Sequence, residues 1–286
     1  MKYNFEFVKY QGCGNDFILR DEFEGPETPD QHRGLLARKL TDRHFGIGAD
    51  GILFVEKSKG VDGSMRLFEV AGNEADMCGN GLRCVGAYLM KKLGKDSVDV
   101  MTGDGVKHIE KVGSEYRTDM GVVRDRRRDL EKYIVGLGSP DDSLLHLTVD
   151  ILGEQQKGSL LNSGEPHLVF VSEDLSSVEM TRIGEWINKD RARFPEYVNV
   201  NFIQVVGPHE VRIRTYERGV FGETMACGTG ATACAAAALL LGLVKPGKVN
   251  VTTNGGTIEV ELGPDRRATM TGPAVEVFRG RAEVEI

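Results

Sequence analysis

An internal duplication is the feature that most restricts how this chain can fold. Residues 74–81 read Glu-Ala-Asp-Met-Cys-Gly-Asn-Gly, and residues 223–230 read Glu-Thr-Met-Ala-Cys-Gly-Thr-Gly. Weaker matches follow in nearly the same register, pairing residues 98–105 with 249–256, 118–121 with 269–272, and 14–17 with 164–167. Repeated matches at one spacing are typical of two copies of one structural unit. The sequence therefore predicts two homologous halves.

The same order of elements is predicted in each half. Strands come first, then a helix, more strands, an apolar helix that follows the Cys-Gly motif, and a strand pair joined at a Gly turn. This pattern indicates an α+β fold of two pseudo-symmetric halves, each a curled and mostly antiparallel sheet around a central helix. We expect residues 1–121 to form the half with Cys78, and residues 122–272 the half with Cys227. Residues 273–286 alternate like a last strand, which could return to either half.

Bulk properties exclude several classes of protein. Of the 286 residues, 40% are hydrophobic and 28% charged, which is a globular composition. The most apolar stretch, residues 233–244, is too short to span a membrane and is typical of a buried helix. The first residues lack the apolar core of a signal peptide, so we expect a cytoplasmic protein. The net charge of −7 argues against nucleic-acid binding.

The five cysteines and six histidines form no recognisable metal motif or disulfide framework, so we expect free thiols and no metal. Cys78 and Cys227 each begin a predicted helix, where unpaired N–H groups and the helix dipole favour a thiolate. The glycines that follow leave backbone N–H groups open to an anion such as a carboxylate. Two such thiols on opposite faces of one carbon could remove a proton and return another, which is racemisation or epimerisation.

Other interpretations of the cysteines remain open at this point. Free cysteines are often merely buried small residues, which suits Cys84 and Cys234 inside the helices and also Cys13. A Cys–His hydrolase with His167 as the partner is conceivable, but it would not need the second cysteine. A non-catalytic amino-acid-binding relative would need neither thiol.

Five motifs together resemble the diaminopimelate epimerase family, and they span nearly the whole chain. They are Gly12-Cys-Gly-Asn-Asp-Phe17, Gly46-Ile-Gly-Ala-Asp50, Met77-Cys-Gly-Asn-Gly-Leu-Arg-Cys84, Val198-Asn-Val-Asn-Phe202, and Tyr216-Glu-Arg-Gly219 with Ala226-Cys-Gly-Thr-Gly230. The resemblance implies conversion of LL- to meso-diaminopimelate in lysine biosynthesis, with an active site in the cleft between the halves. It also implies no cofactor, no pyridoxal phosphate, and a homodimer.

The resemblance assigns roles to individual residues. Cys78 and Cys227 would be the acid–base pair, with His167 near the thiols. The backbone of Gly79, Asn80, Gly228 and Thr229 would bind the reacting carboxylate. The remaining substrate-binding residues would be Asn15, Glu69, Glu165, Asn199, Glu217 and Arg218.

The chain departs from the family pattern at several places. Glu69 and Glu165 stand where the family has asparagines, Gly51 stands where it often has Gln, and the segment 219–223 is one residue longer. An ionised Glu offers only acceptors and repels a distal carboxylate. These two positions favour a substrate with a cationic far end, such as lysine, ornithine, arginine or histidine, as the alternative to diaminopimelate. Isomerases of the proline racemase or phenazine-biosynthesis type match these motifs less well.

Overall fold

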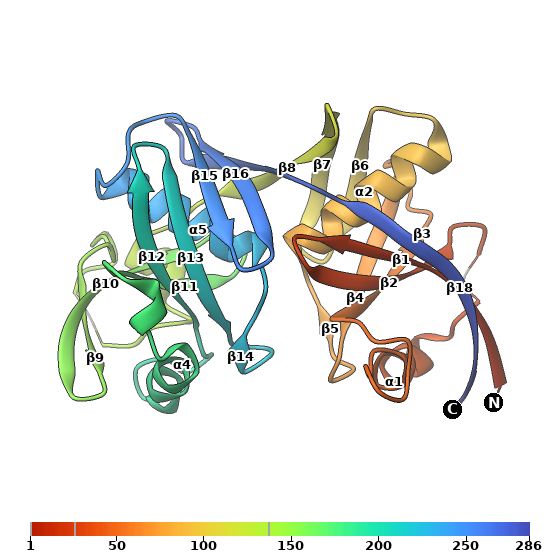
Figure 1. The fold of residues 1–286 in the computed structure, drawn as a ribbon, viewed down its shortest axis with the longest axis horizontal. Coiled ribbons are helices and arrows are strands. Elements are labelled where there is room, and N and C mark those ends of the chain that lie inside the picture. The colour runs from red at the N-terminus through yellow and green to blue at the C-terminus, as the bar shows by residue number, and fades with distance from the viewer. Residues whose placement is uncertain (1, 26, 137) are drawn as a thin grey trace. The chain divides into compact units, whose positions relative to one another are not determined.

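The computed structural model describes residues 2–25, 27–136 and 138–286. The chain divides into two compact units. Unit 1 contains the residues up to 119 together with 271–286, and unit 2 contains residues 120–270. Both combine helices with extended strands, so the α+β class predicted from the sequence is confirmed (Figure 1).

Unit 1 carries two principal helices on a sheet. Its elements are β1 (Lys2–Gly12), β2 (Asn15–Glu22), α1 (Asp30–Leu40), β3 (Gly51–Glu56), β4 (Gly63–Glu69), β5 (Glu74–Ala75), α2 (Gly79–Leu93), β6 (Ser97–Thr102), β7 (Gly105–Val112), β8 (Glu115–Val122) and β18 (Val275–Glu285).

Unit 2 repeats this order, except that one strand, β9, comes at its start where unit 1 has β18 at the end of the chain, and that it has two further short helices. Its elements are α3 (Arg127–Leu130), β9 (Leu147–Ile151), β10 (Glu154–Asn162), β11 (Pro166–Val171), the 3-10 helix η1 (Leu175–Ser177), α4 (Met180–Lys189), β12 (Asn199–Gly207), β13 (Glu210–Glu217), β14 (Gly222–Glu223), α5 (Gly228–Leu240), β15 (Lys248–Thr253), β16 (Gly256–Leu262) and β17 (Arg267–Gly272). Strands β8 and β17 run across the limits of the units.

Strand pairing is the same in both units. β1–β2, β3–β4 and β6–β7 are antiparallel, whereas β2–β3 and β4–β6 are parallel. The corresponding pairs β10–β11, β12–β13 and β15–β16 are antiparallel, and β11–β12 and β13–β15 are parallel. On the outer side, β18 pairs with β1 and β9 pairs with β10 (Figure 1). The C-terminal strand therefore takes in unit 1 the position that β9 takes in unit 2.

Alternation along the strands of unit 1 supplies two apolar layers. Ile18 and Ile52 belong to a cluster with Leu36 of α1, whereas Leu19 and Leu53 belong to a second cluster around α2. Successive side chains of a strand point to opposite faces, so one sheet can support a helix on each side. The helix α2 thus packs on a mostly apolar sheet face, and Asp21 of β2 accepts hydrogen bonds from Tyr88 and Lys92 of the helix.

The sheet of unit 2 differs on the face that meets its central helix. Leu168, Phe170 and Phe202 pack with Ile183 of α4 in one apolar cluster. The alternate positions face the other way, toward α5, which contacts β11, β12 and β13. Four of these positions are polar and buried: His167, Asn199, Asn201 and Thr215.

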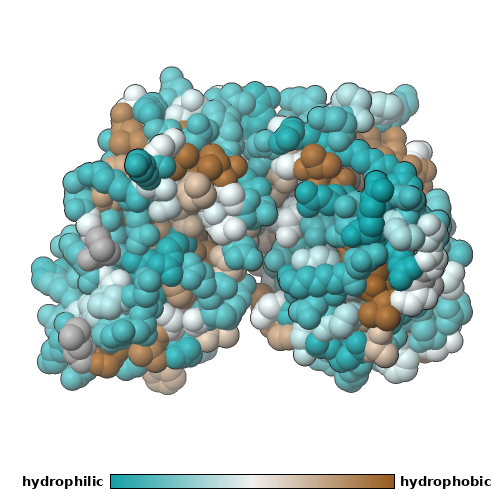
Figure 2. Space-filling model, turned by 180° about the vertical axis from the view of Figure 1, so that it is seen from behind, coloured by the Kyte–Doolittle hydropathy of each residue, from teal (hydrophilic) through white to brown (hydrophobic). Residues whose placement is uncertain are grey.

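The central helix α5 is buried all round, because residues 231–238 are fully buried. Such a helix is the core of its unit. It ends at Leu240, with Leu241 as its C-cap, and the apolar stretch 233–244 continues beyond it. Within the described residues, no helix is long and apolar enough to cross a membrane. On the face seen in Figure 2, both units are mostly hydrophilic, with small apolar patches.

Candidate active site

The two repeated cysteines occupy the same local structure. Cys78 is the N-cap of α2 and Cys227 is the N-cap of α5, both with extended backbone conformations. The sulfur of Cys78 accepts from the N–H of Gly81 at 3.5 Å, and the sulfur of Cys227 accepts from that of Gly230 at 3.3 Å. An N-cap sulfur lies at the positive end of the helix dipole, which favours the thiolate. The predicted helix starts are confirmed.

Cys78 is surrounded by amides whose orientation is fixed by charged groups. Asn15 Oδ1 lies 3.8 Å from the Cys78 sulfur and accepts from Asn80 Nδ2 at 3.1 Å. Asn80 Oδ1 accepts from Arg83 at 2.8 Å, and Asn15 Nδ2 donates to Asp50 at 2.7 Å. Arg83 is fully buried, and its Nε also donates to the carbonyl of Pro273. The structure thus brings Asn15 and Asn80 together with Cys78, in unit 1.

Cys227 is surrounded by a different set of side chains. Thr229 Oγ1 lies 3.3 Å from the Cys227 sulfur and 3.0 Å from His167 Nε2. Asn201 Nδ2 lies 3.1 Å from His167 Nδ1, and Asn199 Nδ2 lies 3.5 Å from Nε2. All of these side chains are buried. The expected site residues His167, Asn199, Gly228 and Thr229 therefore cluster with Cys227, in unit 2.

Burial decides which titratable groups at these sites can carry charge. Burial, and next the positive charge of Arg218, lower the pKa of His167 from its usual value to about 3. The ring is therefore neutral at physiological pH. Burial also raises the pKa of the other cysteines: Cys84 to about 12, and Cys13 and Cys234 above their usual range. These three cysteines stay protonated and unreactive.

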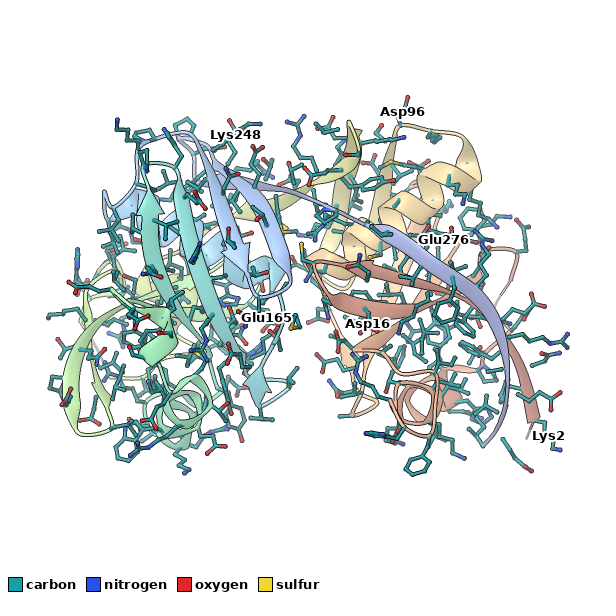
Figure 3. All side chains as sticks on the ribbon, in the orientation of Figure 1. Lys2, Asp16, Asp96, Glu165, Lys248 and Glu276 are labelled. Carbon is teal, nitrogen blue, oxygen red and sulfur yellow. The ribbon has the colours of Figure 1, made fainter. Side chains whose placement is uncertain are left out.

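Glu165 and Arg218 form an ion pair within unit 2. Both Nε and an NH2 nitrogen of Arg218 lie 2.7 Å from Glu165 Oε2. A further guanidinium nitrogen donates to the carbonyl of Glu196 at 3.0 Å, and the backbone N–H of Arg218 donates to Asn199 Oδ1 at 2.9 Å. Glu165, labelled in Figure 3, follows the turn after β10. The Glu that replaces a family asparagine thus neutralises the nearby arginine.

Glu69 and Glu217 end corresponding strands, β4 and β13. Glu69 accepts a hydrogen bond from Asn73 within its own turn. Glu217 accepts from the hydroxyl of Thr224 at 2.5 Å. Glu69 pairs in register with Gly51 on β3, where an added Cβ would come within 2.8 Å of Leu67. The Gln that the family often has after its Gly-Ile-Gly-x-Asp motif would therefore require Leu67 to shift.

The Glu that precedes each Cys-Gly motif has a structural role that the repeat alone did not reveal. Glu74 binds Arg66 through two hydrogen bonds of 2.6 and 2.8 Å, and Glu223 binds Arg214 through two of 2.7 Å. Each pair ties a two-residue strand to the neighbouring long strand. The bidentate pairs therefore hold the segments that enter the two cysteine helices.

Sequence reasoning also missed the polar residues behind the first contacts, namely Asp50, Arg83, Asn201 and Thr215. The sequence offered a signal for Asp50, Arg83 and Asn201, because each is a charged or amide residue inside one of the five motifs shared with the family. Thr215 lies in β13, outside all five motifs, and no sequence pattern indicated a role for it. Among the described residues, no group of three His, Cys, Asp or Glu side chains could hold a metal ion.

Comparison with known proteins identifies the family. The family model described as diaminopimelate epimerase matches residues 7–125 and 159–277. The diaminopimelate epimerase of Methanocella arvoryzae is 38% identical, covering 98% of this chain and 97% of that protein. That of Pelotomaculum thermopropionicum is 39% identical, covering 96% and 97%.

Solved structures support the fold. A phenazine biosynthesis protein of the PhzF family from Bacillus anthracis aligns with a TM-score of 0.68 at 17% identity, covering 99% of this chain and 100% of that one. A hydroxyproline epimerase from Agrobacterium vitis, with bound trans-4-hydroxy-L-proline, aligns with a TM-score of 0.68 at 16% identity, covering 99% of this chain and 92% of that one. The chain thus belongs to the diaminopimelate epimerase family and is an isomerase of the epimerase and racemase type.

Proposed function

We propose that this isomerase inverts the α-carbon of diaminopimelate, with Cys78 and Cys227 as its acid–base pair. The observation that supports the thiol pair most directly is that both sulfurs are N-caps of central helices and accept helix N–H groups. Membership of the diaminopimelate epimerase family supports diaminopimelate as the substrate. The other three cysteines are buried and protonated, which leaves these two for chemistry.

In this mechanism one thiolate removes the α-proton while the other thiol donates a proton to the opposite face of the carbon. The direction of the reaction decides which sulfur begins as the base. The backbone at Gly79 and Asn80, and at Gly228 and Thr229, begins the two helices, where N–H groups and the helix dipole attract an anion. These groups would bind the reacting carboxylate and stabilise the negative charge that develops as the proton leaves.

The ion pair of Glu165 with Arg218 favours a second candidate, the same reaction on a basic amino acid. A distal carboxylate needs a cation, but the guanidinium of Arg218 is already bound by Glu165 and by the Glu196 carbonyl. A carboxylate brought beside Glu165 would be repelled, whereas an ammonium or guanidinium would be attracted. Lysine, ornithine, arginine or histidine would meet this condition.

Proton NMR in D2O with fully reduced enzyme separates the two candidates. LL-diaminopimelate, lysine, ornithine, arginine and histidine would be offered separately, and loss of the α-proton signal measured. Exchange in diaminopimelate would establish the first proposal. Exchange in a basic amino acid, with diaminopimelate unchanged, would establish the second. No exchange in any of them would contradict both.

The double variant Glu165→Asn with Glu69→Asn tests the charge argument itself. Restoring neutral donors should free Arg218 and shift preference toward diaminopimelate, by about tenfold or more in the ratio of kcat/KM values. Glu74→Gln is a control that also removes one carboxylate, but from the Arg66 pair. A preference that did not move in the double variant would show that these glutamates do not select the substrate.

A further inference from the structure

Two hydrogen-bond chains of opposite polarity end at the two cysteine sulfurs. We infer that the resting enzyme holds its thiolate at Cys227 and its thiol at Cys78, and that Asn201, Thr215 and His167 are the positioning residues that set this state. The assignment of catalytic roles to the two sulfurs rests on the proposed function. The resting protonation states are inferred from the contacts within each unit.

The chain at Cys227 starts from Asn201, whose orientation is fixed by two neighbours. Its Nδ2 lies 3.5 Å from the carbonyl of Leu168, which can only accept, and its Oδ1 accepts from Thr215 at 2.9 Å. Nδ2 therefore donates to His167 Nδ1 at 3.1 Å. A neutral imidazole that accepts at Nδ1 carries its proton at Nε2. His167 is neutral, because its pKa is lowered to about 3.

The proton at Nε2 determines the direction of the remaining contacts. His167 Nε2–H donates to Thr229 Oγ1 at 3.0 Å, so the threonine hydroxyl is left to donate to the Cys227 sulfur at 3.3 Å. The N–H of Gly230 donates to the same sulfur at 3.3 Å. A sulfur that receives two donated hydrogen bonds is stabilised as a thiolate.

One contact competes with this tautomer. Asn199 Nδ2 also approaches His167 Nε2, at 3.5 Å, because its Oδ1 is held by the backbone N–H of Arg218. Only one ring nitrogen of a neutral histidine can accept. The Asn201 contact at Nδ1 is shorter, at 3.1 Å, and the 3.0 Å contact of Nε2 with Thr229 gives the ring proton an acceptor. The Nε2–H tautomer satisfies more of these groups.

The chain at Cys78 has the reverse polarity. Arg83 can only donate and Asp50 can only accept, so the amides between them have one consistent orientation. It places Asn15 Oδ1, an acceptor, 3.8 Å from the Cys78 sulfur. An acceptor beside a sulfur favours S–H over a thiolate. The helix N–H contact at Cys78 is also longer, 3.5 Å against 3.3 Å at Cys227.

The charged groups near the two sulfurs act partly against each other. The positive charge of buried Arg83 attracts a thiolate at Cys78, and its guanidinium donates to Asn80 and to the carbonyl of Pro273. Asp50, which accepts a hydrogen bond from Asn15, repels a thiolate at Cys78. Near Cys227, His167 is neutral, and Arg218, behind Asn199, attracts a thiolate while being paired with Glu165. The hydrogen bonds that Thr229 and Gly230 donate to the Cys227 sulfur favour the thiolate there.

The first experiment measures the two thiolates separately in fully reduced enzyme without substrate. Short exposures to iodoacetamide across a pH series, followed by mass spectrometry of the peptides with Cys78 and Cys227, give a pH midpoint for each. The midpoint depends on the pKa of the thiol and not on how easily the reagent reaches it. This distinction is needed because Cys227 is only 7% exposed. We expect the Cys227 midpoint to lie below that of Cys78 by about one pH unit, a tenfold difference in acidity. An equal or reversed order would overturn the inference.

A second measurement covers the case of a cysteine that the reagent does not reach. The ultraviolet absorbance of the thiolate is titrated in Cys78→Ala and in Cys227→Ala. Thiolate at neutral pH should persist in Cys78→Ala and be lost in Cys227→Ala. The opposite pattern would place the resting thiolate at Cys78 and contradict the inference.

Variants in the hydrogen-bond chain at Cys227 distinguish a positioning role from a general loss of structure. Thr229→Val removes the hydroxyl and should raise the Cys227 midpoint by about one pH unit, while Thr229→Ser keeps the donor and should restore it. Thr232→Val is the matched control one turn further along α5, since the Thr232 hydroxyl bonds to the Gly228 carbonyl instead. Asn201→Asp should also raise the midpoint, because an acceptor at Nδ1 moves the ring proton away from Nε2.

An unchanged Cys227 midpoint in both Thr229→Val and Asn201→Asp would show that the chain does not set the thiolate. Failure of the proposed function would appear elsewhere, as the absence of α-proton exchange in every amino acid offered. The alkylation midpoints thus test the inference about the thiolate, and α-proton exchange tests the proposed function independently.

Discussion

The two cysteine sites share a scaffold and differ in what surrounds the sulfur. The hairpin that follows each central helix is closed in the same way: Thr102 and Thr253 each donate to a glycine carbonyl at 2.8 Å and accept a backbone N–H at 3.2 Å. Each preceding Glu binds an Arg on the neighbouring strand. Yet the sheet positions that carry His167, Asn201 and Thr215 in unit 2 carry apolar residues in unit 1, namely Phe17, Leu53 and Leu67.

This difference shows how a duplicated fold can hold two unlike acid–base groups. In unit 2 polar groups reach the sulfur from the sheet beneath the helix. In unit 1 that face is filled by the apolar core, and the polar groups come from the β1–β2 hairpin and the helix itself, through Asn15, Asn80 and Arg83. Unequal environments favour a state in which one thiol is ionised and the other protonated, and a reaction with one base and one acid uses that state.

Removing either sulfur should have the largest effect. Cys78→Ala and Cys227→Ala should each lower kcat for epimerisation by about a thousandfold or more, because each removes one of two required proton transfers. Cys234→Ala, which changes a fully buried thiol inside α5, is the control and should retain activity. High activity in Cys78→Ala or in Cys227→Ala would contradict the requirement for two thiols.

The histidine of unit 2 should make stability depend on pH. The pKa of His167 is about 3 in the folded protein, against its usual 6.5, so the unfolded chain binds more protons between these values. Its contribution to the free energy of unfolding is fully present above about pH 6.5 and is lost as the pH falls toward 3, by up to about 1.4 kcal/mol per pH unit.

His167→Phe introduces the residue type of the corresponding position in unit 1 and should remove this dependence. Urea unfolding at pH 7 and pH 5 measures it as the difference in the slope of stability against pH between the two proteins. His108→Phe, which changes a histidine outside the site, is the control. The same slope in wild type and His167→Phe would show that the buried ring does not resist protonation.

The two arginine–glutamate pairs should differ modestly in their value to stability. Arg214 also donates to the carbonyls of Leu175 and Val178, whereas the further bond of Arg66 goes to the exposed carboxylate of Asp30. Arg214→Ala should therefore lower the free energy of unfolding by about 2 kcal/mol, and Arg66→Ala by about 1 kcal/mol. Urea unfolding checks the order, and a larger loss in Arg66→Ala would contradict it.

Much of the framework could be predicted from local patterns. The apolar spacing of residues 82–93 and the alanine-rich run from 231 located both central helices, and each starts at its cysteine. The repeat indicated equivalent strands, and their pairing is the same in both units. The apolar stretch continues to residue 244, but α5 ends at Leu240 with Leu241 as its C-cap, just before Gly242. Hydrophobicity alone does not mark the point where helical hydrogen bonding stops.

The amino-acid sequence by itself determined the duplication, the α+β class, the two helix-capping cysteines and the family resemblance, because each depends on residue types at short or repeated spacings. Only the tertiary structure decided that Glu165 neutralises Arg218, that Glu74 and Glu223 tie down strands, and that Asn201 and Thr215 orient His167 toward Thr229. These contacts join residues far apart along the chain. The direction of a hydrogen bond depends on all of its neighbours at once, which no local pattern encodes.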